Sequence, residues 1–142
     1  MVITPIVNDG RINRSKTTLN KIVAATISLL RKNNNGQIPT AQEIAVKSGV
    51  GIRTVFRHID DMEGLIEEVN RRYLNDLESY IAKNNPKQSS KDQRIEHVIK
   101  ERFYLYNTYQ HVFNLTITSL NNSNAIRTGF IKFNHILRQR FE

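Results

Sequence analysis

Apolar residues recur at intervals of three or four along most of this chain, and polar runs separate the stretches. The first stretch covers about residues 16–32 and predicts an amphipathic helix with the stripe Leu19, Ile22, Val23, Thr26, Ile27 and Leu30. Asn33 to Gly36 ends it, and Pro39 favours a clean start for the next helix at Thr40. Residues 1–15 show no such period, which predicts a flexible basic arm.

Residues 40–59 predict two short helices separated by a tight turn. Thr40 and Glu43 have the Thr-x-x-Glu spacing of a capping box, which starts the first of them. Gly49 can adopt the left-handed conformation that ends a helix. The second helix should begin at Gly51 or Ile52 and end at His58 or Ile59. Its expected buried edge is Ile52, Val55, Phe56 and Ile59. Two short helices joined in this way form a helix-turn-helix.

The remaining stretches also have helical spacing. Asp60 and Glu63 predict the start of a long helix that ends near Lys83, with an expected buried side of Leu65, Ile66, Val69, Tyr73, Leu77, Tyr80 and Ile81. Further helices are predicted over 92–109, 111–120 and 124–142, and 111–120 is apolar nearly all round, so it should be buried.

No strand pattern occurs, so the predicted fold is all-α. The expected organisation is a basic arm (1–15), a three-helix helix-turn-helix DNA-binding head (16–60), a connecting helix (61–83) and a C-terminal helical bundle (84–142).

The charge of the chain favours a polyanionic partner. The formal net charge is +8, with +6 in residues 1–60, −3 in residues 61–85 and +5 in residues 86–142. The absence of cysteine excludes disulfides and thiolate metal sites, and it fits a reducing cytoplasm. No run approaches the ~18–20 apolar residues of a membrane span.

The outward side of the second short helix carries Arg53, Thr54, Arg57 and His58, and no carboxylate lies among them. Such a surface suits a DNA major groove. Arg53 and Arg57 are the candidates for guanine edges. Gln42 could reach an adenine, and Ile52 a thymine methyl group. The candidates for phosphate contact are Thr40, Thr54, His58, Lys16 and the amides at helix starts, such as that of Gly51.

These residues carry a resemblance to a known family. The stretch from Thr17 to Leu65 resembles the DNA-binding domain of the tetracycline-repressor (TetR) family of bacterial transcription regulators. The matching residues are Ala24-Ala25, Gly36, Thr40, Ile44-Ala45, Gly49-Val50, Thr54-Val55-Phe56, His58 and Leu65. The sequence departs from the family pattern at Gly51, Ile59 and Met62. Phe56 stands where the family commonly has a phosphate-bonding tyrosine. Because it lacks the hydroxyl, it is assigned to packing and backbone contact.

The resemblance implies a cytoplasmic, ligand-responsive repressor that binds double-stranded operator DNA as a homodimer, without a cofactor. It also implies that residues 84–142 form an effector-binding and dimerisation region. Two further helices usually follow in the family, so this region is expected to be incomplete.

Phe103, Tyr106, Tyr109 and Phe113 could line a pocket for a small-molecule effector, or they could fill the core, as aromatic residues at helical spacing more often do. The histidines have no ligand-type neighbours at metal-binding spacing, and no catalytic motif occurs, so neither a metal site nor an enzyme is predicted. The alternative function is a protein-interaction module that keeps the helix-turn-helix fold without operator specificity.

Overall fold

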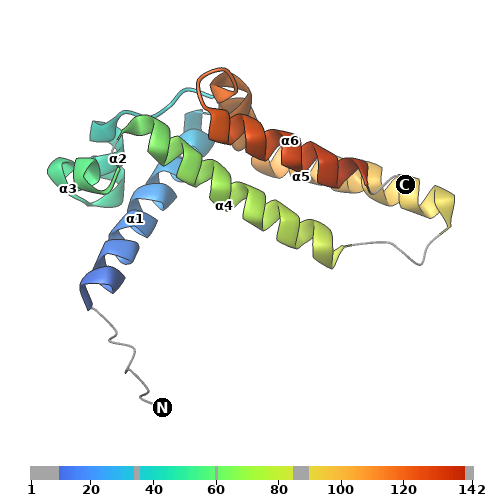
Figure 1. Cartoon of the computed structure of the whole chain (residues 1–142), viewed down its shortest axis with the longest axis horizontal. Helices are drawn as coiled ribbons and strands as arrows, with labels where there is room; N and C mark the ends of the chain where they lie inside the picture. The colour runs from blue at the N-terminus through green and yellow to red at the C-terminus, as the bar shows by residue number, and fades with distance from the viewer. Residues whose placement is uncertain (1–9, 34–35, 60, 85–89, 140–142) are drawn as a thin grey trace, which may run out of the picture.

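The computed structural model describes residues 10–33, 36–59, 61–84 and 90–139, and over these residues the fold is all-α, as predicted. Its helices are α1 (Gly10–Asn33), α2 (Ala41–Ser48), α3 (Ile52–His58), α4 (Met62–Lys83), α5 (Lys91–Ser119) and α6 (Asn124–Arg138). Figure 1 shows α2 and α3 gathered beside α1 at one end of an elongated molecule, while α4, α5 and α6 extend away from them.

The predicted apolar stripes of α1 and α4 are confirmed as largely buried, and the α1 stripe packs with the first half of the α4 stripe in one core. That core joins α1, α2 and α3 to the first half of α4 and to parts of α5 and α6. Its buried members are Ile22, Val23, Leu30, Ile44, Ala45, Val55, Ile59, Leu65, Ile66, Val69, Leu115 and Ile126. A second core lies farther along the molecule and contains Tyr73, Leu77, Ile81, Leu105, Val112, Phe133 and Leu137. The two cores make α4 the element shared by both ends.

The start of α2 and the turn between α2 and α3 form as the sequence predicts. The Thr40 hydroxyl accepts a hydrogen bond from the Glu43 backbone N–H at 3.3 Å, and the Glu43 carboxylate accepts one from the Thr40 backbone N–H at 2.8 Å. This is the expected capping box. Gly49 ends α2 with φ of 67°, in the left-handed region. Interactions within one or two turns of the chain therefore determine where α2 begins and where it ends.

The start of α1 corrects a prediction. The helix begins at Gly10, so residues 10–15 are helical and are not part of an arm, while residues 1–9 lie outside the described residues. In these turns side chains bond the backbone one turn earlier, as Thr17 does to the Asn13 carbonyl at 2.9 Å. Apolar periodicity could not reveal these turns because they are exposed and bury no apolar side chain.

The start of α4 lies one residue later than expected. Asp61 caps the helix by accepting a hydrogen bond from the Gly64 backbone N–H at 2.7 Å. Asp60, the predicted cap, lies outside the described residues. Beyond this point the predicted inner side of α4 is buried, except that Tyr80 is half-buried, and Asn70 joins it as an additional buried polar residue.

One helix replaces the two that were predicted over 92–109 and 111–120. α5 continues through Tyr109, where φ of −118° and ψ of 16° mark a kink. The expectation that 111–120 is buried all round is wrong, because the Ile117 side chain is 58% exposed. Helix α6 begins at Asn124 as predicted, and it approaches α4 closely. A Cβ on Gly129 would lie 2.7 Å from Cδ1 of Leu74.

Candidate nucleic-acid interface

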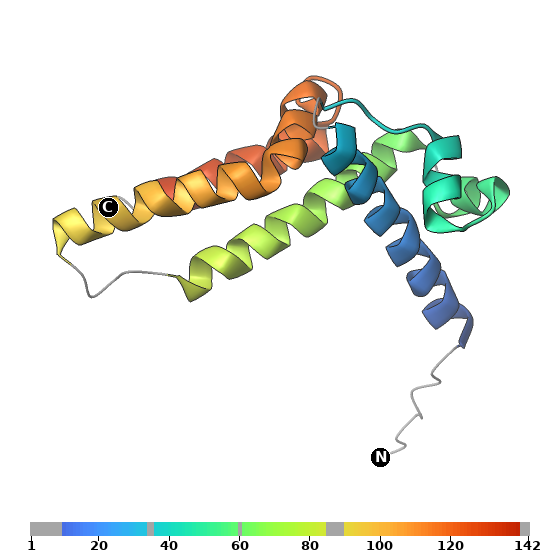
Figure 2. The same cartoon turned by 180° about the vertical axis from the view of Figure 1, so that it is seen from behind.

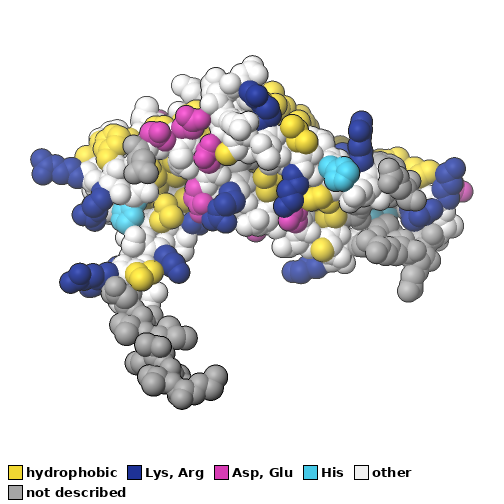
Figure 3. All heavy atoms as spheres, in the orientation of Figure 1, with side chains coloured by type: hydrophobic (Ala, Val, Ile, Leu, Met, Phe, Trp, Pro, Cys, Tyr) yellow, Lys and Arg dark blue, Asp and Glu magenta, His cyan; other side chains and the backbone are white. Residues whose placement is uncertain are grey.

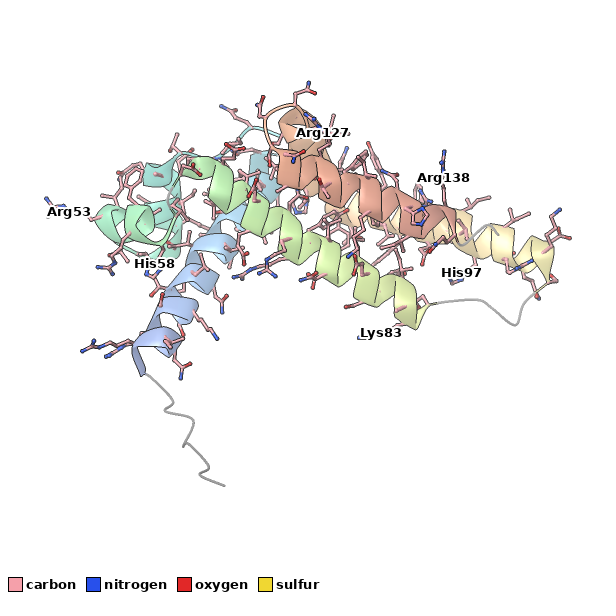
Figure 4. All side chains as sticks on the ribbon, in the orientation of Figure 1. Arg53, His58, Lys83, His97, Arg127 and Arg138 are labelled. Atoms are coloured by element: carbon pink, nitrogen blue, oxygen red, sulfur yellow. The ribbon has the colours of Figure 1, made fainter. Side chains whose placement is uncertain are left out.

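Helix α3 lies at the extreme end of the molecule, opposite the far ends of α4 and α6. Figure 4 shows Arg53 pointing outward from this end, whereas Lys83 and Arg138 lie toward the other end. Helix α3 is seven residues long and contains no carboxylate. Arg53 and Arg57 are exposed, so their guanidinium groups are accessible to a large partner. Figure 3 shows Lys and Arg side chains around this end and along the start of α1.

Helix α3 is anchored by a narrow apolar edge. Val55 is fully buried, and Ile59 is buried just beyond the helix end. Gly51 forms the N-cap with its backbone alone, accepting hydrogen bonds from the N–H groups of Thr54 at 2.8 Å and Val55 at 3.0 Å. The orientation of α3 is therefore set by two apolar side chains and one backbone cap.

Two residues of the predicted buried edge of α3 are instead exposed. Phe56 is 56% exposed and Ile52 is 39% exposed. Successive helix residues are separated by 100°, so a helix held by Val55 and Ile59 turns Phe56 away from α1 and α2. The assignment of Phe56 to packing is therefore wrong within this chain. Phe56 and Ile52 are therefore exposed on the same helix as Arg53 and Arg57.

A basic depression of about 350 Å³ lies between the start of α1 and the end of α3. It is lined by Arg11, Arg14, Ser15, Thr18, Arg57 and His58. Arg11 and Arg14 were expected on a flexible arm, but the helix holds them beside Arg57. The spacing 11, 14, 15 and 18 follows one helix side, and this was the signal in the sequence that could have placed them. Cations and hydroxyls together form a surface suited to an anion such as phosphate.

His58 lies at the border between basic and acidic surfaces. Besides the basic depression, it lines a second hollow together with Asp61, Glu63, Glu67 and Glu68. Asp61 caps α4 and Glu63 lies in its first turn, where both complement the positive end of the helix dipole, and Glu67 and Glu68 follow in the next turn. The basic depression therefore adjoins an acidic hollow at the start of α4.

The remaining predicted contact residues lie in different environments. Gln42 on α2 and Lys16 on α1 are exposed, and Thr54 is half-buried. The Thr40 hydroxyl is engaged in the α2 cap, where it donates to the Glu43 carboxylate at 2.8 Å. Hydrogen bonds from the Thr40 backbone N–H and hydroxyl hold the pKa of Glu43 below its usual value. The anionic Glu43 beside Thr40 makes this threonine a poor site for a phosphate contact.

The four aromatic residues predicted to line a ligand pocket lie in different surroundings. The Phe103 side chain is 72% exposed. Tyr109 and Phe113 pack edge-on against Tyr73, with ring centroids 5.0 Å and 5.9 Å away, respectively. Tyr106 and Phe113 line a groove between α5 and α6. Tyr109 and Phe113 thus contact the core, whereas Phe103 and Tyr106 are exposed.

The described residues contain no group of three or more His, Asp or Glu side chains placed to hold a metal ion. None of the helices in the described part of the chain is long and apolar enough to cross a membrane. Comparison with protein-family models, curated proteins and solved structures finds no match. The function of this surface is therefore inferred from the charge and exposure of its own residues.

Proposed function

We propose that this protein is a DNA-binding transcription regulator of the TetR type, a repressor whose α2–turn–α3 segment acts as a helix-turn-helix. The observation that carries the proposal is the exposed, carboxylate-free surface of α3 at the end of the molecule, with Arg53 and Arg57 accessible. A short protruding helix of this kind fits the major groove, which admits an α-helix.

The proposed roles follow from exposure. Arg53, at the start of α3, reads base edges, because arginine can bond guanine O6 and N7 bidentately. Ile52 and Phe56 are exposed and supply apolar contact, for instance with a thymine methyl group. Gln42 on α2 is exposed and is the candidate for an adenine edge.

The basic depression between α1 and α3 receives a DNA phosphate. Arg11, Arg14 and Arg57 supply charge there, and Ser15 and Thr18 supply hydroxyl groups. Phosphate contacts of this kind fix the register of the protein on the duplex, and they make its affinity dependent on salt. Lys16, also on α1, adds to this contribution.

A small-molecule effector would act through α4. This helix contributes Leu65, Ile66 and Val69 to the core of the head, and Tyr73, Leu77 and Ile81 to the core of the other end. A ligand that shifts α4 therefore shifts α3 relative to the DNA. In a homodimer, fixed half-site spacing would make affinity sensitive to that shift.

The experiment that tests the proposal is selection of binding sites from a random double-stranded DNA pool at physiological salt, followed by titration of the selected sequence. Enrichment of a defined sequence is expected. The double variant Arg53→Ala/Arg57→Ala should lose the preference for the selected sequence. The control Lys83→Ala/Arg138→Ala removes the same charge at the other end of the molecule and should retain it. Salt-dependent binding to every sequence without enrichment would contradict the proposal.

One observation favours a second candidate function, a protein-interaction module without operator specificity. Phe56 is 56% exposed and Val46 is 75% exposed, and they lie on α3 and α2. Exposed apolar residues beside cations are typical of protein interfaces as well as of DNA interfaces. If the selection fails to enrich a sequence while Phe56→Ala abolishes binding to a protein partner, this second function would replace the first.

A further inference from the structure

Helix α5 is apolar on two sides, and only one of them is buried. The inner side contains Val98, Leu105, Val112 and Leu115, which are all at most 5% exposed. A second set recurs at intervals of three, four and seven along the same helix, and we call it the outer stripe: Ile95, Ile99, Phe103, Tyr106, Phe113 and Ile117. A helix that is apolar on two sides must be covered on both to remove that surface from water.

The outer stripe is largely uncovered. Ile99 is 63% exposed, Phe103 72% and Tyr106 52%. Figure 2 shows α5 from the side on which no other described helix lies over it. None of the stripe residues is charged, so the stripe can approach a like surface without repulsion between its own members.

A groove of about 360 Å³ runs beside the stripe. Tyr106, Phe113 and Ile117 belong to both the stripe and the groove, and α6 supplies the opposite wall with Phe130, Phe133 and Leu137. Exposed aromatic rings and a groove lined by apolar side chains thus lie on the same surface. Such a surface is self-complementary, because in a two-fold arrangement the rings of each copy can enter the groove of the other.

The size of this surface fits an interface. Five of the six stripe residues are exposed, and Phe113 is half-buried. An exposed aromatic or branched side chain leaves on the order of 100 Å² in contact with water, so the five present roughly 500 Å². That lies in the upper half of the range for the largest apolar patch of a typical monomer, about 300–600 Å². Two copies would bury roughly 1,000 Å², which is about the minimum expected of a specific interface.

We propose that a second copy of this chain packs along the outer stripe, with α5 of one copy beside α5 of the other. The head adjoins the C-terminal half of α5. Gly36 approaches the backbone of Asn114, and Arg31 bonds His111. A parallel pairing of the two α5 helices therefore brings both heads to the same end. Only this orientation rests on the proposed DNA function, since two DNA half-sites need two heads on one side.

The absence of cysteine makes a direct test possible, since any single introduced cysteine is the only thiol in the chain. In separate variants, Ile99→Cys, Tyr106→Cys and Ile117→Cys should each form a disulfide-linked dimer under mild oxidation, because parallel pairing places identical positions opposite one another. The control Val46→Cys, on exposed α2, should remain largely monomeric. Cross-linking that requires mixing Ile99→Cys with Ile117→Cys would overturn the parallel orientation.

Sedimentation of the full chain without DNA supplies the second measurement. A dimer is expected, and Phe103→Glu should raise its dissociation constant by about tenfold or more. Phe56→Glu makes the same change on α3 and should leave the dissociation constant unchanged. A monomer at all concentrations, or a dimer that is indifferent to Phe103→Glu, would overturn the proposal. A stripe-dependent dimer that selects no DNA would instead retain this interface and remove the proposed function.

Discussion

The hydroxyl of Thr116 on α5 lies 3.0 Å from the side-chain amide oxygen of Asn70 on α4, which makes a polar contact between two buried helix faces. The same hydroxyl lies 2.8 Å from the backbone carbonyl oxygen of Val112. A hydroxyl has one proton and can donate to only one of them. The amide nitrogen of Asn70 has no partner, so this contact leaves a buried polar group unsatisfied.

Removing one member of this pair should therefore cost more than removing both. Thr116→Val should lower the free energy of unfolding by about 1–3 kcal/mol, because Asn70 then keeps no partner. Adding Asn70→Leu should recover most of that loss, since the leucine buries without polar groups. Urea unfolding of the two single variants and the double variant measures this coupling. Additive effects would contradict it.

His111 predicts a dependence of stability on pH. Its ring nitrogen accepts a hydrogen bond from the Arg31 guanidinium at 3.4 Å, which joins α5 to α1. Burial, and then the charge of Arg31, lower the pKa of His111 below its usual value of 6.5. A lowered pKa in the folded state means that this contribution to stability is present above the usual value and is lost as the pH falls below it.

The free energy of unfolding should accordingly decrease between about pH 7.5 and 5.5, and His111→Gln should reduce that decrease. Chemical denaturation at both pH values measures it. His135→Gln is the control, because this histidine is exposed on α6. An equal decrease in the native chain and in His111→Gln would show that other groups cause the dependence.

Two glycines should differ in their tolerance of alanine. Gly49 has φ of 67° with nothing within 4 Å of an added Cβ, so Gly49→Ala should cost about 1–2 kcal/mol from backbone strain alone. Gly36 has φ of 73°, and its Cβ would lie 3.1 Å from the Asn114 carbonyl, so Gly36→Ala should cost more. Gly10→Ala, which meets nothing, is the control. Thermal unfolding gives the ranking, and equal losses at both glycines would contradict it.

The proposed DNA contacts should separate into two kinds. Arg53→Ala should relax specificity at one base position, with a loss of discrimination of about 1–3 kcal/mol. Lys16→Ala should weaken binding to all sequences about equally and lower the salt slope by roughly one. Titration of selected and random duplexes at several salt concentrations distinguishes them. If Arg53→Ala and Lys16→Ala weakened binding to the selected and the random duplexes in the same way, the assignment of roles would be contradicted.

The sequence by itself determined the local features of this protein. The cap at Thr40 and Glu43 and the left-handed Gly49 depend on residues within one or two turns, so spacing alone predicted them. The apolar stripes of α1 and α4 also followed from spacing, because α4 buries one side along most of its length and α1 does so over its second half. The all-α fold was therefore predictable, and so was the presence of Arg53 and Arg57 on an exposed helix.

The tertiary structure decided which residues share a surface. It turned Phe56 outward, placed Arg11 and Arg14 beside Arg57, and divided the aromatic residues of α5 between a core and an uncovered stripe. Each outcome depends on contacts between helices far apart in the sequence. Helical periodicity shows which residues lie on the same side of a helix, but only packing shows whether that side meets another helix or water.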